Sequence, residues 1–238
     1  MTRVLVAVPL VAGAELELPV TTARHLLQVL RLRDGAAITL FNGDGCEYPA
    51  RLRVEGRRAV AVVLRSVVAQ RESPLALTLA QCVSKGERMD YTIQKAVELG
   101  VTRLIPLRST NSVVKLEAAR WERKLAHWRD VIGAACEQSG RNRLPELAPV
   151  QEFSVWLTRA EGLRLVLDPR GGASLKTLPP TAAVSVLVGP EGGLAAAEFA
   201  AARDAGFRPL GLGPRVLRTE TAGVAALAAI QALWGDLG

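Results

Sequence analysis

The hydrophobic pattern of the chain changes character near residue 73, and this change most constrains the possible folds. Before it, short apolar runs follow one another with tight turns between them. After it, apolar runs alternate with longer stretches of helical periodicity. The segment between them, residues 70–74, is polar and ends in proline, which is typical of a linker. We therefore predict two domains, residues 1–72 and 73–238.

The first domain is predicted to be a compact β-barrel. Strands are expected over residues 3–9, 36–41, 46–54 and 59–68, with a short helix over residues 21–30 capped by Thr21 or Thr22. The turns Asn42-Gly43-Asp44-Gly45 and Glu55-Gly56 separate the later strands. Sequential short strands with tight turns favour a closed, compact sheet.

The second domain is predicted to be of the α/β class. Strands are expected over residues 75–83, 101–107, 163–167, 183–188 and 207–210. Helices are expected over residues 87–99, 117–138, 194–205 and 221–234, with Gly100 and Gly140 ending the first two. Strands that alternate with helices predict a mostly parallel sheet covered on both faces.

Composition excludes several classes of protein. Hydrophobic residues make up 49% of the chain, which is too many for global disorder. No run approaches the roughly 20 uncharged apolar residues of a membrane-spanning helix, so we expect a cytoplasmic protein without a membrane partner. Three cysteines without a C-x-x-C pair, and two distant histidines, His25 and His127, predict no metal site.

The chain is basic, with a formal net charge of +7 at pH 7. A basic surface favours an anionic partner, because each neutralised phosphate of a nucleic acid releases counterions. A solvated, arginine-rich surface without a partner is the alternative interpretation of the same charge.

A first glycine-rich loop follows a predicted strand. Residues 186–193 read VLVGPEGG, and a helix is expected to begin directly afterwards. Ligands bind beyond the carboxyl ends of strands in open α/β sheets, and glycines let the backbone approach a ligand closely. Glycine content alone also fits an ordinary turn, but Glu191 points to a site, because a carboxylate there is costly unless it is solvated or used.

A second glycine-rich loop, residues 210–222, reads LGLGPRVLRTETA. Gly211 and Gly213 superficially match a dinucleotide fingerprint, but Val216 stands in place of the third glycine and the chain ends too soon for the acidic partner. A nicotinamide site is therefore disfavoured. Thr219 or Thr221 is expected to cap the final helix.

Together, Gly189-Pro190-Glu191-Gly192-Gly193 and Leu217-Arg218-Thr219-Glu220-Thr221-Ala222 closely resemble the RsmE family of SPOUT methyltransferases. Residues 94–101 (QKAVELGV), residues 137–141 (EQSGR) and His25 with Val29-Leu30-Arg31 resemble further family segments. The resemblance covers nearly the whole chain in order.

The resemblance implies methylation of N3 of a specific uridine in 16S ribosomal RNA, with S-adenosyl-L-methionine as cofactor. It implies a PUA-like RNA-binding barrel at residues 1–72 and a SPOUT domain with a C-terminal trefoil knot at residues 73–238. It also implies a homodimer that acts on small-subunit RNA within the 30S particle. The final helix, with Leu227, Ile230 and Trp234 on one stripe, is a candidate dimer interface, and intramolecular core is the alternative.

The resemblance and uridine chemistry together predict the site residues. The cofactor is expected to contact Leu167, Leu187, Gly189, Gly192, Leu210, Gly211, Leu212, Gly213, Val216 and Leu217. N3 carries a proton that must leave, so Arg218 is expected to stabilise O2 or O4 and Glu220 or Glu191 to assist proton removal. A Glu220 that merely pairs with an arginine is the alternative. The expected RNA contacts are Arg24, Arg31, Lys85, Lys95 and Arg141.

The chain departs from the family pattern at Leu194 and Ala195, where phenylalanine and serine are common. Loss of the serine is expected to weaken the cap of the helix that follows, in which Glu198 would complete a capping box. Two rival functions remain. A non-catalytic RNA-binding or assembly protein would not bind the cofactor, and a ribose 2′-hydroxyl methyltransferase would typically carry a Ser-Leu-Asn type signature in place of Arg-Thr-Glu-Thr.

Overall fold

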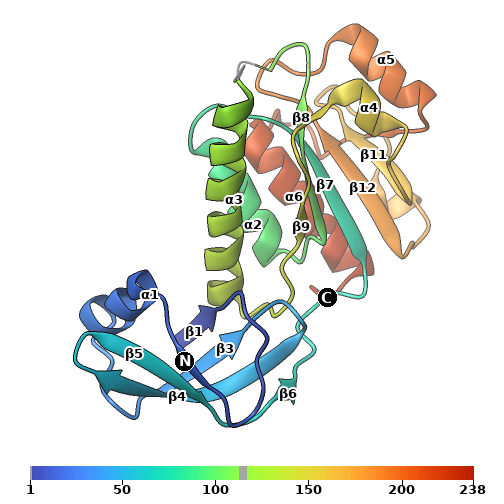
Figure 1. Cartoon of the computed structure of the whole chain (residues 1–238). Coiled ribbons are helices and arrows are strands. Elements are labelled where there is room, and N and C mark those ends of the chain that lie inside the picture. Colours follow the sequence, from blue (N-terminus) through green and yellow to red (C-terminus); the bar gives the residue numbers. More distant parts are fainter. Residues whose placement is uncertain (1, 113–116) are drawn as a thin grey trace. The chain divides into compact units, whose positions relative to one another are not determined.

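The computed structural model describes residues 2–112 and 117–238. The chain divides into two compact units (Figure 1). The first contains Met1–Glu72 and Cys136–Leu144, and the second contains Ser73–Ala135 and Pro145–Gly238. The expected linker coincides with the passage between the units after Glu72. The first unit also takes in residues 136–144, which the sequence analysis had assigned to the second domain.

The first unit is built on a mainly antiparallel sheet, and its strands run in the order β1-β3-β4-β5-β2, with β6 on β4. Their bounds are Thr2–Leu5 (β1), Glu15–Glu17 (β2), Ala37–Phe41 (β3), Cys46–Glu55 (β4), Arg58–Val63 (β5) and Val67–Val68 (β6). Among the described residues of this unit, only β1 and β3 pair in parallel. The ladders described do not join the end strands β1 and β2, so hydrogen bonding alone does not close this sheet into the expected barrel.

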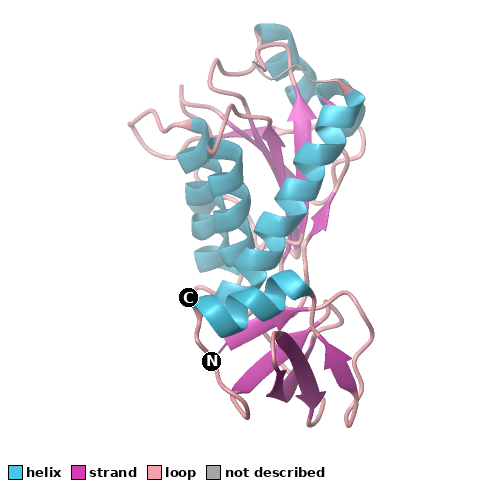
Figure 2. Cartoon of the chain, turned by 60° about the vertical axis from the view of Figure 1, so that its left-hand side comes forward, coloured by secondary structure: helices cyan, strands magenta, loops and turns pink. Residues whose placement is uncertain are grey.

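A short helical segment accompanies this sheet (Figure 2). The α-helix α1, Val20–Arg24, continues as a π-helical turn, η1, His25–Val29. The predicted threonine cap is wrong: the helix begins directly after Pro19 and has no side-chain cap. Pro19 has a backbone φ of −51°, which its ring restricts to values near that of a helix, but proline has no side-chain oxygen that could accept a hydrogen bond from the first N–H groups of the helix.

Polar contacts tie residues 136–144 to the first unit. The Arg141 guanidinium pairs with the Glu72 carboxylate at 2.6 Å, and the Arg141 side chain is only 6% exposed. Arg3 donates hydrogen bonds to the Arg141 carbonyl and the Asn142 side chain. Arg141 is therefore a buried structural residue, and the prediction that it contacts RNA is corrected.

The second unit is built on a parallel sheet, as predicted. Its strands run in the order β10-β8-β7-β12-β11-β13, with β9 on β8, and every pairing described is parallel. Their bounds are Ala76–Cys82 (β7), Arg103–Arg108 (β8), Glu146–Leu147 (β9), Gln151–Glu152 (β10), Leu163–Leu167 (β11), Ala183–Val188 (β12) and Arg208–Leu210 (β13).

Helices cover both faces of this sheet (Figure 1). Their bounds are Arg88–Glu98 (α2), Ala118–Ser139 (α3), Phe153–Leu157 (α4), Ala196–Asp204 (α5) and Thr219–Trp234 (α6), with a 3₁₀ turn, η2, at Leu175–Thr177. One core cluster joins α4 and α5 to side chains such as Ala80 and Cys82 of β7. Because side chains alternate along a strand, Leu79 and Gln81 face the other way, where Gly223 of α6 packs against them.

Helix α6 contributes to the core of its own unit. Leu227 and Ile230 are fully buried there, which supports the core alternative for these two residues rather than a dimer interface. Among the described residues, no helix is both long and apolar enough to cross a membrane.

The N-terminus of α5 retains half of a capping box. The Ala195 N–H donates to Glu198 Oε2 at 3.0 Å, but alanine has no side-chain oxygen to return a hydrogen bond. We expect Ala195→Ser to supply it and to raise the free energy of unfolding by about 0.5–2 kcal/mol. Denaturant-induced unfolding measures this change, with Ala200→Ser at an exposed position of the same helix as control. A gain no larger than that of the control would contradict the prediction.

Candidate functional site

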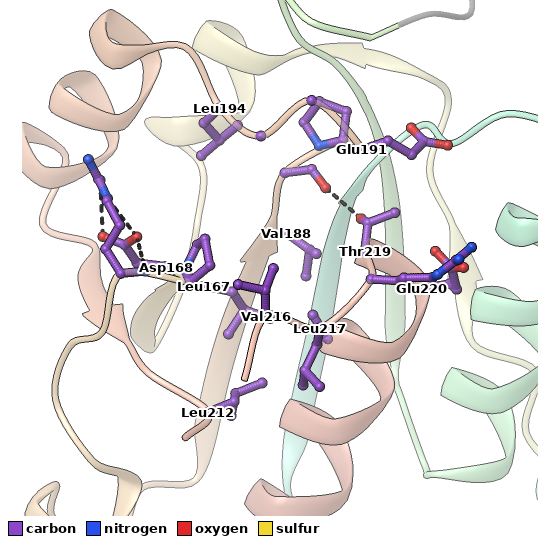
Figure 3. Close-up of a pocket in the computed structure, with 18 of the residues that line it drawn as sticks. Leu167, Asp168, Val188, Glu191, Leu194, Leu212, Val216, Leu217, Thr219 and Glu220 are labelled. Carbon is purple, nitrogen blue, oxygen red and sulfur yellow. Dashed lines mark hydrogen bonds and ion pairs between the residues drawn. The ribbon is translucent and has the colours of Figure 1, made fainter. Parts of the chain in front are cut away.

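A pocket of about 850 Å³ opens beyond the carboxyl ends of β11, β12 and β13, against the start of α6 (Figure 3). Strand β11 lies between β12 and β13 in the sheet, so the loops that follow the three strands are neighbours. Parallel strands direct these loops to the same edge, which is where α/β sheets bind ligands. The tertiary structure therefore joins the two glycine-rich loops to a third, residues 168–172, at one site.

Eight of the ten expected cofactor residues line this pocket: Leu167, Gly189, Gly192, Leu210, Leu212, Gly213, Val216 and Leu217. Leu187 does not, because alternation along β12 directs its side chain into the core cluster beneath α5. Gly211 does not either. A Cβ on Gly211 would lie 3.0 Å from the Gly172 nitrogen, so this glycine allows two backbones to pack closely.

Glu191 and Glu220 lie on one side of the pocket, and both approach Arg88 (Figure 3). Glu191 accepts hydrogen bonds from the Lys85 N–H at 3.1 Å and the Arg88 guanidinium at 3.2 Å. Burial alone would raise the pKa of Glu191, but these hydrogen bonds and one from its own backbone hold the pKa below its usual range. Glu191 is therefore an ionised, well-bonded group that orders its loop.

Glu220 lies in the first turn of α6 and is less fully bonded. Its Oε1 is 3.8 Å from the Arg88 guanidinium, and its side chain is 15% exposed. Its Oε2 is buried and has no hydrogen-bond partner among the described residues. A buried carboxylate oxygen without a partner is costly. The residue that carries this oxygen lines the pocket.

Arg218 lines the same pocket and is exposed. Within residues 2–112 and 117–238, no carboxylate lies within ion-pair distance of its guanidinium. A guanidinium offers five N–H donors and keeps its charge at any physiological pH. Arg218 can therefore stabilise negative charge on a bound group.

Asp168 lies on the opposite side of the pocket (Figure 3), and Arg170 also lines the pocket. Asp168 accepts three hydrogen bonds from Arg170, two from the side chain at 2.9 and 3.0 Å and one from the backbone at 3.0 Å. Those from the side chain hold the pKa of Asp168 below its usual range against the effect of burial. The Arg170 guanidinium also lies over the Phe199 ring at 4.8 Å. No motif in the sequence marks these two residues, although Asp168 directly follows a predicted strand.

Thr219 is the first residue of α6, and its predicted role as a cap is wrong. The residue before the helix is Arg218, and no side chain caps the helix. The Thr219 hydroxyl instead donates to the Gly189 carbonyl at 2.6 Å and accepts from Gln81 Nε2 at 2.9 Å. Thr219 therefore connects the two glycine-rich loops.

The remaining expected RNA contacts lie on different surfaces. Arg24 and Arg31 are exposed in the first unit, where Arg24 bonds to Gln28 and Arg31 has a φ of +54°. The side chain of Lys85 is exposed. Its backbone N–H donates to Glu191, so Lys85 lies beside the first glycine-rich loop. Lys95 pairs with Glu98 one turn further along α2. The side chains of Arg24, Arg31 and Lys85 remain accessible for RNA.

No group of three or more His, Cys, Asp or Glu side chains is placed to share a metal ion in the part of the chain that the structure describes.

Comparison with known families identifies the protein class. Residues 71–231 match the model of an RNA methyltransferase domain, and residues 18–65 match that of an RNA methyltransferase PUA domain. A protein named ribosomal RNA small subunit methyltransferase E from Buchnera aphidicola is 33% identical over 217 residues, which cover 90% of this chain and 88% of the relative. The chain belongs to the RsmE family. The Bacillus subtilis protein of the same name is 32% identical over 87% of this chain and 86% of its own length.

Solved structures share the fold of this RsmE chain. A Neisseria gonorrhoeae ribosomal RNA small subunit methyltransferase E, bound to S-adenosyl methionine, is 41% identical with a TM-score of 0.92 over 100% of both chains. A putative methyltransferase from Legionella pneumophila with bound SAM is 39% identical with a TM-score of 0.95 over 99% of both chains. The architecture is therefore a PUA-like domain and a SPOUT-type α/β methyltransferase domain.

The RsmE pocket fits S-adenosyl-L-methionine. Leu167, Leu212 and Val216 provide apolar surface between the two polar sides (Figure 3). Glycines at 189, 192 and 213 leave the backbone accessible to a ligand. The lining carries both signs of charge, three carboxylates and four guanidiniums, namely Asp168, Glu191, Glu220, Arg88, Arg170, Arg215 and Arg218. Both signs suit a cofactor that carries a sulfonium, an ammonium and a carboxylate group.

Proposed function

We propose that the chain uses S-adenosyl-L-methionine to methylate N3 of a specific uridine in 16S ribosomal RNA. The observation that carries this proposal is that Arg218 and Glu220, two residues apart in sequence, line one pocket. Among the described residues, the Arg218 guanidinium has no carboxylate partner and Glu220 Oε2 has no hydrogen-bond partner. N3 attack needs both groups, because uracil must lose a proton and its ring must accommodate the resulting negative charge.

The eight lining residues of the glycine-rich loops and of β11 would hold the cofactor. When bound, S-adenosyl-L-methionine supplies an electrophilic methyl group on a sulfonium. The leucine side chains would exclude water from this part of the pocket, and backbone N–H groups of the glycine-rich loops would orient the polar ends.

Arg218 would act on the uracil ring. N3 lies on the Watson–Crick edge, so the target base must be unpaired or turned out of a helix before it enters the pocket. The Arg218 guanidinium would then donate hydrogen bonds to O2 or O4, where negative charge develops as the N3 proton leaves.

Glu220 rather than Glu191 would accept the N3 proton. Glu191 already accepts hydrogen bonds from Lys85 and Arg88, and its lowered pKa makes it a weaker base. Glu220 also lines the pocket, and its Oε2 has no hydrogen-bond partner among the described residues. Glu191 would hold Arg88 and the loop in place.

The assembly proposed with this function is a homodimer, and the C-terminal segment of each chain forms a trefoil knot. The dimer would act in the cytoplasm on RNA in the 30S particle. Two observations support the knot: β13 pairs with β11 rather than β12, and Gly172 packs against the Pro209 carbonyl. Arg24, Arg31 and Lys85 are the accessible residues proposed to contact RNA.

The function is tested by incubating the protein with labelled S-adenosyl-L-methionine and small ribosomal subunits that lack this modification. Mass spectrometry of the digested RNA is expected to show one 3-methyluridine per 16S RNA molecule. A methyl on ribose would support the alternative SPOUT activity instead. Isothermal titration without measurable cofactor binding would favour a non-catalytic RNA-binding protein.

A further inference from the structure

A buried hydrogen-bond chain connects three segments that are distant in sequence. Gln81, at the end of β7, donates through Nε2 to Thr219 Oγ1 at 2.9 Å. Thr219, at the start of α6, donates to the Gly189 carbonyl at 2.6 Å. Gly189 begins the first glycine-rich loop of the pocket. We call Gln81, Thr219 and Gly189 the relay.

The direction of the relay follows from the hydrogens available. Threonine has a single hydroxyl hydrogen, and the Gly189 carbonyl can only accept, so that hydrogen lies between them. Thr219 Oγ1 must therefore accept from its other neighbour, which places the Gln81 amide nitrogen, and not its oxygen, toward Thr219. The second Nε2 hydrogen reaches the Cys82 carbonyl at 3.2 Å.

Burying the Gln81 side chain at this position costs folding free energy. The residue is 1% exposed, and its Oε1 has no hydrogen-bond partner among the residues described. Its neighbours on the same face are apolar, and Gly223 leaves the space that its amide fills, since a Cβ there would lie 3.2 Å from Oε1. A buried amide that is only partly satisfied stabilises a fold less than an apolar side chain of similar size would.

The position of the relay accounts for this cost. Thr219 lies between Arg218 and Glu220 in the chain, and consecutive Cα atoms are about 3.8 Å apart. Holding the Thr219 hydroxyl against the Gly189 carbonyl therefore sets where both reacting side chains lie relative to the cofactor loop. Other contacts hold the rest of that loop, such as Asn111 to the Gly193 carbonyl at 3.1 Å.

We infer that Gln81 and Thr219 are positioning residues that align Arg218 and Glu220 with the cofactor loop through the Gly189 carbonyl. The inference rests on the proposed roles of Arg218 and Glu220. It assigns the relay to alignment during methyl transfer rather than to cofactor affinity.

Thr219→Val tests the relay, because valine keeps the shape of threonine and removes the hydroxyl. We expect kcat at saturating cofactor to fall by about 10²-fold, as small misalignments of reacting groups can do. The dissociation constant for S-adenosyl-L-methionine, from isothermal titration, is expected to change by less than about threefold. Thr219→Ser retains the hydroxyl and is expected to recover kcat to within about threefold of the parent protein.

The matched control is Ser185→Ala, which removes a buried hydroxyl that donates to the Glu161 carbonyl at 2.8 Å, on the same strand that leads to Gly189. It is expected to lower the melting temperature without lowering kcat. A Thr219→Val loss of kcat smaller than about tenfold, or an equal loss in Thr219→Ser, would overturn the inference. If Thr219→Val does not fold, Gln81→Met replaces it, because methionine has a similar volume and lacks the amide donor. The same limits on the loss of kcat and on the change of the cofactor dissociation constant then apply to Gln81→Met.

Amide hydrogen exchange keeps this test separate from the proposed function. Thr219→Val is expected to speed exchange in residues 189–193 and 218–220, whereas Ser185→Ala is not. Unchanged exchange there would overturn the relay even if the parent protein were inactive. An inactive parent with faster exchange in the variant would reject only the proposed reaction.

Discussion

Arg218→Ala is expected to lower kcat for RNA methylation by about 10²–10³-fold, the usual effect of removing one donor that stabilises developing negative charge. Arg218 is exposed to the pocket and has no carboxylate partner among the described residues, so its charge is free to act on the substrate. Uracil gains negative charge at O2 and O4 as N3 loses its proton, and alanine leaves that charge unstabilised.

Cofactor binding separates this role from a structural one. The affinity for S-adenosyl-L-methionine in Arg218→Ala is expected to stay within about threefold of the parent value, because the guanidinium is assigned to the base. Arg208→Ala, at an exposed position of β13 outside the pocket, removes the same charge and is expected to leave kcat unchanged. Unchanged turnover in Arg218→Ala would disprove the assigned role.

Glu220→Gln is expected to lower kcat by about 10²–10⁴-fold, the range that a positioned general base contributes. Glutamine has the size of glutamate and keeps an oxygen that can face Arg88, which lies 3.8 Å from Glu220 Oε1, but it cannot take up the N3 proton. Glu191→Gln is expected to lower kcat by less than about tenfold, because Glu191 is assigned to ordering the loop and Arg88.

The pH dependence of kcat in Glu220→Gln provides an independent measurement. The activity of this variant is expected to rise with pH more steeply than that of the parent, because ionisation of N3 in solution replaces the missing base. Glu122→Gln, at an exposed position of α3, controls for the loss of one carboxylate. Parallel pH profiles, or a larger loss in Glu191→Gln than in Glu220→Gln, would count against Glu220 as the base.

Local sequence patterns were sufficient for the long elements of the second unit. Strands β11 and β12 have the predicted bounds, and α2 and α3 end before Gly100 and Gly140, where φ is +76° and +84°. Alternation and helical periodicity are properties of consecutive residues, so they are readable without the fold. Strands β2, β9 and β10 were missed because two or three residues contain no period and become strands only through their partners.

The candidate site was predictable where a short motif carries the chemistry. Eight of the ten expected cofactor residues line the pocket, and Glu191, Arg218 and Glu220 line it too. The sequence says less about residues whose surroundings depend on a distant neighbour. Arg141 lies beside Glu72, 69 residues away, and the backbone of Gly211 lies against Gly172.

The sequence by itself determined the division near residue 73, the α/β class of the second unit, and the two glycine-rich loops with their charged residues. Only the tertiary structure decided that β11 lies between β12 and β13, that Arg88 joins Glu191 and Glu220, and that Thr219 bonds to Gly189 instead of capping α6. The physical reason is the separation along the chain over which each effect acts. Hydrophobic periodicity and backbone conformation act over a few residues, whereas the contacts that align this pocket join segments from 30 to 138 residues apart, and only chain packing brings these together.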